Sequence, residues 1–378
     1  MDQLSENQSQ ITQFDILRGI AIIGVFMVHS QYAIYPNFDF SYGSYFIILP
    51  KKGELFKYLS MSPMAFGWLG VILFFIISGF LIHYVTLKKG IENFEAKLFF
   101  NKRFWRIYPP YLITLLFFTF ANQSISQVIH HPLDFISHLF LVHTFSSEYF
   151  FSINGVFWSL AVEVHLYLLY PAFLLIRKKI GLRNTLLSLL AIHIICTFIW
   201  WYISNCNNIV LGNFILRHWF TWSIGAFIAE CYYTKDYLLS KLPNKILFLS
   251  FIIFYLSKLF YFHIITDYLF STLLIAILVE KLLLKPVSLK VSYWQKAMIP
   301  IGLCSYSLYL LHMPFQKHLY EAIDLFHYSS NHKALFWIIN TGPVFLILFF
   351  ISYGSYIFIE QKSSKYGHMF YNKYFLKK

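Results

Sequence analysis

Apolar runs of about 20 residues recur from one end of this 378-residue chain to the other, and they limit its fold more than any other feature. A run of that length crosses the hydrocarbon core of a bilayer as an α-helix. Hydrophobic residues make up 58% of the chain and charged residues only 12%. A soluble protein of this size has too little polar surface to cover so much apolar material. The sequence therefore predicts an all-α integral membrane protein.

Ten transmembrane helices can be delimited along the chain, with no appended soluble domain. We expect them at 14–35, 67–87, 107–121, 156–176, 185–203, 213–233, 246–263, 265–283, 298–317 and 335–359. The stretch 132–145 is too short and too polar to cross, and an interfacial or re-entrant helix is expected there. One membrane domain over residues 1–378, with a core at about 14–360, is therefore predicted.

Lysine and arginine are distributed unevenly between successive connections. Of the 30 basic residues, 22 lie in the even-numbered connections and the C-terminal tail, and five lie in the odd-numbered connections. The positive-inside rule then places both termini in the cytoplasm, as in a multi-pass protein of the inner membrane. The same distribution accounts for the net charge of +13. Because the basic residues do not follow one amphipathic face, we expect contacts with the lipid bilayer and no nucleic-acid binding.

Ionisable side chains inside a predicted span are costly and mark candidate functional residues. The first span, FDILRGIAIIGVFMVHS, carries Arg18 and His29 eleven residues apart. That spacing returns both side chains to nearly the same helix face, roughly 16 Å apart along the axis. Asp15 lies one turn before Arg18 and can form an ion pair with it. The alternative is that Arg18 extends to the headgroups and that His29 forms an ordinary hydrogen bond between helices.

A polar stripe runs along the fourth span, FWSLAVEVHLYLLYP. Ser159, Glu163 and Tyr167 repeat at intervals of four residues and share one face. Glu163 lies deep in the span, so it needs a cation, a histidine or its own proton as a partner. A structural hydrogen bond is the alternative to a functional role.

Small and polar residues also share faces in the second and ninth spans. Ser78 follows Gly67, Gly70 and Phe74 on one face of the second span. His312 ends a face of the ninth span that begins with Gly302, Ser305 and Tyr309. Small residues allow a neighbouring helix or a thin ligand to approach the backbone, and close helix packing is the stronger interpretation for these residues other than His312.

A basic cluster precedes the third span in NKRFWRIYPPYL. It consists of Lys102, Arg103 and Arg106, at the predicted inner end of that span. The planar forks of two guanidinium groups suit a phosphate or pyrophosphate. Anchoring of the topology is the alternative interpretation of this cluster.

Taken together, these segments resemble the integral-membrane acyltransferases of acyltransferase family 3, which include bacterial O-antigen and Nod-factor O-acetylases. The likeness extends over nearly the whole chain and includes an Arg-x10-His element at Arg18 and His29. It also includes GVILFFIISGFLI at 70–82, RFWRIYPPYL at 103–112, FWSLAVEVHLYLLYP at 157–171 and CSYSLYLLHMPF at 304–315. Glu360 in FIEQK matches the acid expected at the end of the last span, but the proline expected after it is absent.

This resemblance implies transfer of an acyl group, usually acetyl, from cytoplasmic acyl-CoA to a hydroxyl group. The acceptor it implies is a sugar of a surface or lipid-linked glycan, such as lipopolysaccharide or another polysaccharide. By the same likeness His29 is the catalytic histidine and Arg18 its essential partner. Arg103 and Arg106 would contact the CoA phosphates, with Lys102 beside them.

Physical chemistry suggests how these groups act. A histidine near pH 7 is suited to take the proton of an attacking hydroxyl, so His29 is the expected general base. Glu163 is expected to fix the tautomer of His29, and Arg18 to hold the acyl carbonyl or the pantetheine arm, which enters along Ser78. An acyl-histidine intermediate is the variant of this direct attack. The supporting residues are expected to be Asp15, Tyr167, His312 and Glu360.

Two other classes of function fit parts of the pattern. A proton-coupled transporter would use His29, Glu163 and His312 as a relay. A non-catalytic membrane assembly protein is the other, but it has no use for an inward-facing arginine pair.

The outer connections offer aromatic rings and histidines. Stacking on sugar faces or membership of an aromatic belt is expected for Tyr42, Tyr45, Tyr149, Phe150 and Trp158. No metal is expected, because the spacing is unlike that of a helical metal pair at His130, His131, His138 and His143.

Overall fold

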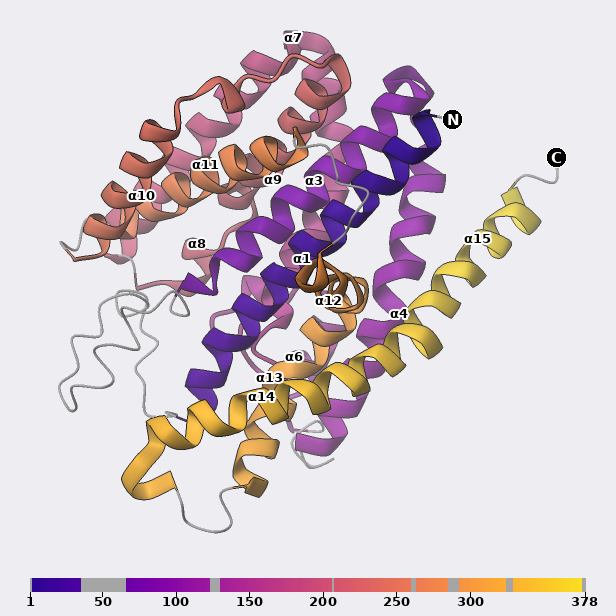
Figure 1. Cartoon of the computed structure of the whole chain (residues 1–378). Helices are drawn as coiled ribbons and strands as arrows, with labels where there is room; N and C mark the ends of the chain where they lie inside the picture. The colour runs from indigo at the N-terminus through magenta and orange to yellow at the C-terminus, as the bar shows by residue number, and fades with distance from the viewer. Residues whose placement is uncertain are drawn as a thin grey trace.

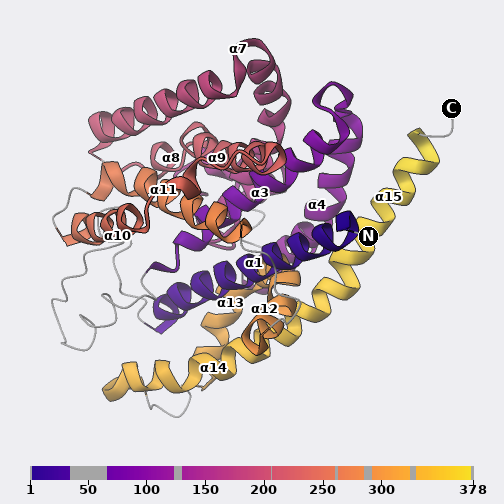
Figure 2. The same ribbon diagram turned by 45° about the horizontal axis from the view of Figure 1, so that its top comes forward.

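A computed structural model describes residues 2–34, 66–122, 130–205, 207–259, 263–284, 292–323 and 329–375. The regular elements within these ranges are all helices, and most of them run alongside one another in an elongated bundle (Figures 1 and 2). Both ends of the chain lie at the same end of that bundle in the two views. The expectation of an all-α protein is confirmed for these residues.

The helices follow the chain in a simple order. They are α1 (Asp2–Ile34), α3 (Leu69–Lys89), α4 (Ala96–Asn122), α6 (Pro132–Leu139), α7 (Phe157–Ser204), α8 (Ile209–Gly212), α9 (Ile215–Thr234), α10 (Asn244–Leu259), α11 (His263–Leu283), α12 (Tyr293–Leu303), α13 (Ser305–Ile323), α14 (Ser329–Ser355) and α15 (Gln361–Phe375). Short turns of helix are η2 (Ile91–Asn93), η3 (His143–Phe145), η4 (Leu239–Lys241) and the π-helical η6 (Tyr356–Glu360).

Four described helices are long and apolar enough to cross a membrane, and a bent pair brings the number to as many as five. The four are Thr12–Ser30, Leu69–Lys89, Phe157–Ser204 and Trp337–Phe375. Each of the ten expected spans overlaps a helix, and 132–145 contains only the short α6 and η3. The multi-pass character is therefore supported, whereas ten crossings and cytoplasmic termini stay predictions.

Helix α7 contains two of the expected spans, 156–176 and 185–203, and bends between them. Gly181 has φ 79° and ψ 162°, a conformation that is strained for any residue with a Cβ. The basic residues between these two spans lie around the bend, and they are Arg177, Lys178, Lys179 and Arg183. The glycine thus allows two long apolar segments to follow each other with almost no loop between them.

The ninth span is not one helix, so this expectation is wrong. Helices α12 and α13 meet at Cys304 with an angle of 77°. Pro300 has no backbone N–H to donate within α12, and Gly302 lies against the backbone oxygen of Asp15 in α1. The bend separates Gly302 from the face that carries Tyr309 and His312.

Glycine contacts bring the backbones of α3 and its neighbours close together. Gly70 of α3 faces the carbonyl of Ala21 in α1, and Gly79 faces that of Trp222 in α9. Gly225 of α9 faces the carbonyl of Ile76 in return. Small residues allow helices to pack closely inside a bilayer, where the hydrophobic effect does not drive helices together.

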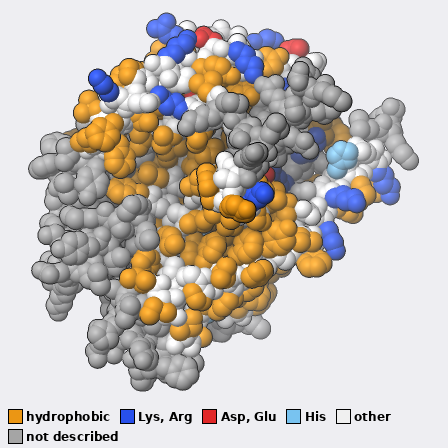
Figure 3. Space-filling view, in the orientation of Figure 1, with side chains coloured by type: hydrophobic (Ala, Val, Ile, Leu, Met, Phe, Trp, Pro, Cys, Tyr) orange, Lys and Arg blue, Asp and Glu red, His pale blue; other side chains and the backbone are white. Residues whose placement is uncertain are grey.

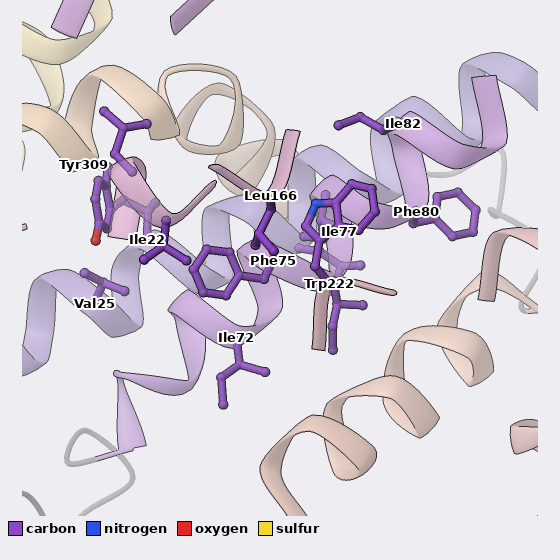
Figure 4. Packing of buried hydrophobic residues seen from close by; sticks show 14 of the residues in the cluster. Ile22, Val25, Ile72, Phe75, Ile77, Phe80, Ile82, Leu166, Trp222 and Tyr309 are labelled. Atoms are coloured by element: carbon purple, nitrogen blue, oxygen red, sulfur yellow. The ribbon is translucent and has the colours of Figure 1, made fainter. Parts of the chain in front are cut away.

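Large side chains fill the space beside these glycine contacts. Figure 4 shows Phe75, Phe80 and Leu166 near Trp222, and all four are buried. This core holds α3, α7 and α9 against one another at the level of the polar residues described below. The space-filling view shows hydrophobic side chains over the middle of one face, with Lys and Arg along the upper edge and around α15 (Figure 3).

A charged cluster links the same three helices. Glu230 of α9 accepts hydrogen bonds from Nε and Nη2 of Arg177 in α7, the latter at 2.8 Å. His83 of α3 contacts Glu230 through Nε2 at 2.9 Å and the hydroxyl of Tyr170 through Nδ1 at 3.0 Å. A partly buried carboxylate in a bundle is tolerated when cations and donors surround it, as they do here.

The chain ends in a helix that continues past the last expected span. Helix α15 follows α14 through η6 and packs against the beginning of α4. Asn101 of α4 donates to the carbonyl of Gly367 at 2.9 Å, and Tyr371 donates to Glu95 at 3.1 Å. The end of the chain thereby covers the helix that carries the basic cluster.

The glycine contacts predict a difference between two identical substitutions. Gly79→Ala should lower stability by about 1–3 kcal/mol, because the new Cβ overlaps the Trp222 carbonyl and forces α3 away from α9. Gly354→Ala in α14 is the matched control, since nothing lies within 4 Å of its added Cβ. The control should be neutral or gain up to about 1 kcal/mol from helix propensity. Thermal unfolding of the purified proteins in detergent measures both, and equal melting temperatures for the two variants would contradict the packing described.

Candidate active site

A cavity of about 310 Å³ lies among α1, α3, α4, α7 and α13. This volume is at the lower end of the range for small-molecule sites. Apolar side chains of α3 form much of its wall, and charged and hydroxyl groups converge on it from the other helices. The residues that concern its chemistry are Arg18, Ser78, Arg103, Arg106, Glu163 and Tyr309.

Arg18 is held at the cavity by an ion pair within its own helix. Its Nη1 donates to Oδ1 of Asp15 at 3.1 Å, and Asp15 is buried. Arg106 and Glu360 are also close enough to interact electrostatically with Arg18. The pair between Asp15 and Arg18 expected from the sequence is confirmed.

Glu360 closes this group from the opposite end of the chain. Ser307 of α13 donates to Oε2 of Glu360 at 3.0 Å. The Glu360 carboxylate also interacts electrostatically with Arg106. Glu360 is buried in the π-helical turn η6, which widens the helix at this point. The acid at the end of the last span is therefore part of the same charged group as Arg18, even without the expected proline.

Arg103 also lines the cavity, and its guanidinium group lies near two aromatic rings. Its guanidinium carbon lies 5.6 Å from the ring centre of Tyr167 and 5.8 Å from that of Phe99. Its Nε is buried and has no hydrogen-bond partner among the described residues. An unsatisfied guanidinium N–H between two aromatic rings is a ready donor for an anionic ligand. Arg106, three residues further along α4, is more exposed and lines the same cavity.

Glu163 accepts the last bond in a chain of donors along one wall. Trp222 donates to Ser78 at 3.3 Å, and the Ser78 hydroxyl lies 3.1 Å from that of Tyr167. Tyr167 in turn donates to Oε1 of Glu163 at 2.5 Å. The stripe predicted on the fourth span is thus confirmed as a geometric feature. Its carboxylate faces the Arg103 side of the cavity, where the two charges interact.

The imidazoles of His29 and His312 form a direct pair. Nδ1 of His29 lies 2.8 Å from Nε2 of His312. Nδ1 of His312 lies 2.8 Å from the carbonyl oxygen of Tyr309 and 3.2 Å from that of Leu308. A carbonyl can only accept, so this nitrogen of His312 carries the hydrogen and Nε2 of the neutral ring is an acceptor. His29 must then donate through Nδ1, which leaves the basic lone pair of its neutral ring on Nε2.

One expectation about His29 is corrected by this arrangement. Its tautomer is set by His312 and not by Glu163, because the Glu163 carboxylate is bonded to Tyr167 further along α7. The cavity lining includes Arg18 but does not include His29. The two residues share a helix without sharing the walls of that cavity.

Tyr309 connects the cavity with the imidazole pair. It lines the cavity, and its hydroxyl lies 2.5 Å from that of Ser159. Its ring centre lies 5.6 Å from that of His312 and 6.1 Å from that of Phe74. Two hydroxyl groups and one aromatic ring therefore separate the end of the cavity from the histidines. Sequence periodicity grouped Tyr309 with His312, but did not indicate that it forms this wall.

The outer connections are described only in part. Tyr42 and Tyr45 lie outside the described residues, and Phe150 stacks on Trp158 with ring centres 6.0 Å apart. His138 and His143 stack at 3.8 Å and are buried. Burial, with His138 as a second cause, lowers the pKa of His143 to about 2, so this ring is neutral at physiological pH.

No grouping of three metal-binding side chains occurs within the ranges described above. The stacked pair His138 and His143 lies beside Asp134, whose Oδ1 is 3.1 Å from Nδ1 of His138.

Comparisons with known proteins show to which family this sequence belongs. The model of one family, the acyltransferase domain, matches residues 11–360. ORF330 of Acidianus two-tailed virus, whose name describes it provisionally as an acetyltransferase, is 28% identical over 270 residues, which are 68% of this chain and 76% of the viral protein. Peptidoglycan O-acetyltransferase OatA of Listeria monocytogenes is 30% identical over 138 residues, which are 32% of this chain and 22% of OatA.

A third relative is an uncharacterised protein of Haemophilus influenzae, 28% identical over 158 residues that cover 38% of this chain and 61% of that protein. No solved structure gives a significant match. The family match includes Arg18, His29, the arginines of α4 and Glu360. This chain belongs to the acyltransferase family, and it is an enzyme that transfers acyl groups.

Proposed function

We propose that this protein is a membrane O-acetyltransferase, which moves an acetyl group from cytoplasmic acetyl-CoA to a hydroxyl of a surface or lipid-linked glycan. The observation that carries the proposal is the cavity between two chemically different ends. One end has Arg103, whose Nε has no hydrogen-bond partner among the described residues, and the other has hydroxyls that lead to a histidine pair. A long substrate with anionic and reactive ends fits such a site, and acyl-CoA is a substrate of that kind.

The donor would bind from the side of α4. Its phosphates would receive hydrogen bonds from Arg103 and Arg106, since guanidinium forks bind phosphate in a bidentate manner. Its pantetheine arm would follow the cavity past Ser78, and its thioester would reach the hydroxyls of Ser159 and Tyr309. The alternating apolar and hydroxyl lining suits an arm of amides and methylenes.

The distance along α1 supports a particular role for Arg18 in this proposal. Eleven helical residues separate it from His29 by roughly 16 Å. A group so far from the general base cannot contact the same carbonyl that the activated hydroxyl attacks. We therefore assign Arg18 to the donor arm or its phosphates, and the stabilisation of the oxyanion to Tyr309 and Ser159.

The chemical step follows from the tautomer of His29. The acceptor hydroxyl would give its proton to Nε2 of His29 while its oxygen attacks the thioester carbonyl carbon. Tyr309 or Ser159 would turn its hydroxyl to the developing oxyanion. The carbon–sulfur bond then breaks, the imidazolium returns a proton to the CoA sulfur, and the acetyl ester is released. His312 would accept the Nδ1–H bond throughout and keep the ring in orientation.

The acceptor would approach His29 from the side opposite the arginines. A glycan is proposed because OatA carries the name of a peptidoglycan O-acetyltransferase, although this chain spans 22% of its length. Delivery of acetyl groups to a surface glycan requires a protein that lies in the cytoplasmic membrane, and the apolar helices suit that location. The donor would be used up as a substrate, and no metal is part of the proposal.

The arginines of α4 should be required for donor binding. Replacing both in the double variant Arg103→Ala and Arg106→Ala removes two charge-assisted contacts, so the Kd for acetyl-CoA should rise tenfold or more. Arg183→Ala, an exposed arginine beside the bend of α7, is the control and should bind as the unmodified protein does. Calorimetry in detergent measures both, and unchanged binding by the double variant would disprove this donor site.

The general base should be required for transfer but not for donor binding. His29→Ala should reduce acetyl transfer by about 100-fold or more, because a positioned base contributes about that much to the rate. Its affinity for acetyl-CoA should stay within about twofold, since His29 does not line the donor cavity. Radiolabelled acetyl transfer to membrane glycans gives the rate. A variant with the full rate would exclude His29 as the base.

The partner of the base should act through positioning. His312→Leu removes the acceptor for the Nδ1–H bond, and kcat should fall by about 10–100-fold while KM for acetyl-CoA is unchanged. His312→Gln restores an acceptor oxygen and should recover part of kcat. If the two variants have the same kcat, His312 does not act through its hydrogen bond to His29.

A further inference from the structure

A second, smaller pocket opens beside the donor cavity. It has a volume of about 80 Å³ and lies at the turn between α3 and α4. Val85 and Arg103 line both spaces, so the two are neighbours at the end that the arginines occupy. This volume is far below that of a complete small-molecule site, so it suits one chemical group of a larger ligand.

Basic side chains surround this pocket. Lys89, at the end of α3, and Lys102, in α4, line it together with Arg103. Burial, followed by the positive charges of Lys89 and Arg103, lowers the pKa of Lys102, which lies before the predicted third span. Lys102 is thus close enough to be repelled by both of the other cations, and an anion would stabilise such a region.

One carboxylate also lines the pocket and must be weighed against the cations. Glu95 raises the pKa of Lys102 and is the smallest of the effects on it. The Glu95 carboxylate already accepts a hydrogen bond from Tyr371 of α15 at 3.1 Å. The cations of the pocket therefore outnumber its one carboxylate, and that carboxylate has another partner.

The turn that carries Lys89 has a fixed shape. Gly90 has φ 86°, a conformation that favours glycine, and Asn93 donates to the carbonyl of Lys89 at 2.8 Å. These contacts hold the end of α3 over the first turns of α4. Lys89 ends α3 and Lys102 lies in α4, and the turn at Gly90 joins these two helices.

We propose that this second pocket, between Lys89 and Lys102, binds the 3′-phosphate on the ribose of the CoA donor. The inference rests on the proposed function and adds a specificity for one part of the donor. CoA carries a pyrophosphate and a separate phosphomonoester, and this face of the protein offers two adjacent cationic places. Arg103 and Arg106 would hold the pyrophosphate, and the lysine pocket would hold the monoester. A phosphomonoester with a charge near −2 gains more from two ammonium groups than a diester does.

A comparison of two donors tests this assignment directly. CoA and 3′-dephospho-CoA differ only in the phosphomonoester, and calorimetry on the full chain in detergent gives the Kd of each. The unmodified protein should bind CoA about tenfold or more tightly, as expected for charge-assisted contacts to one phosphate. Equal affinity for the two would overturn the 3′-phosphate site and leave the proposed function intact. Binding of neither would overturn both.

Variants of the lysines show where the difference arises. The double variant Lys89→Gln and Lys102→Gln should bind CoA about tenfold more weakly and 3′-dephospho-CoA with nearly unchanged affinity. The matched control is Lys178→Gln with Lys179→Gln, two exposed lysines near the bend of α7, which should keep the preference. Both lysines of the pocket are exposed, and the melting temperature verifies that the double variant folds. A preference for CoA that survives in a folded double variant would place the 3′-phosphate elsewhere.

Discussion

A guanidinium that leaves water must recover its lost hydration from nearby anions and acceptors, and this constraint determines where ligands can bind in an apolar bundle. Arg177 meets the requirement with Glu230, and Arg18 meets it with Asp15. Arg103 has two aromatic rings and a distant carboxylate, and its Nε stays without a partner within the described chain. Both of these arginines have a carboxylate partner within the bundle, whereas Arg103 keeps a buried N–H that an anionic ligand could accept from. In the function proposed above, that anion is part of the acyl donor.

Helix α1 separates the tasks of the site along its length. Its N-terminal half carries Asp15 and Arg18, with Arg18 lining the cavity, and its C-terminal end carries His29 beside His312. A single helix fixes the distance between these groups more rigidly than two helices could. An enzyme that joins a donor from one side of a membrane to an acceptor from the other needs such a fixed separation, because the two substrates must meet at one depth.

Sequence reasoning located the helices and most polar residues because periodicity depends only on local geometry. It identified Ser159, Glu163 and Tyr167 as one stripe of α7, and it identified Asp15 as the partner of Arg18 in α1. In each case the residues belong to the same helix. The partner of His29 could not be found in this way. His312 lies 283 residues further along the chain, and a helical pattern does not show which face meets which neighbour. Glu163 was the expected partner because a deep carboxylate needs a cation, a histidine or its own proton.

The bend in the ninth span was missed for a related reason. The run from 298 to 317 has the length and hydropathy of a single crossing, and Pro300 alone did not indicate a bend of 77°. The contact of Gly302 with the backbone of α1 is a tertiary event. Hydropathy likewise found no sign of the network of His83, Arg177 and Glu230, because its members come from three different spans.

Helix α13 shows why the bend matters for the chemistry. Tyr306 near its start donates to the carbonyl of Ile107 in α4 at 2.8 Å, and Gln316 near its end donates to that of Phe26 in α1 at 3.0 Å. The helix is therefore tied to α4, which carries Arg103 and Arg106, near one end and to α1, which carries His29, near the other. Between these ties it places Tyr309 at the end of the cavity and His312 against His29. A straight continuation of α12 would direct α13 along another path and would separate the hydroxyls from the imidazoles, so the kink is what brings the proposed oxyanion donors beside the proposed base.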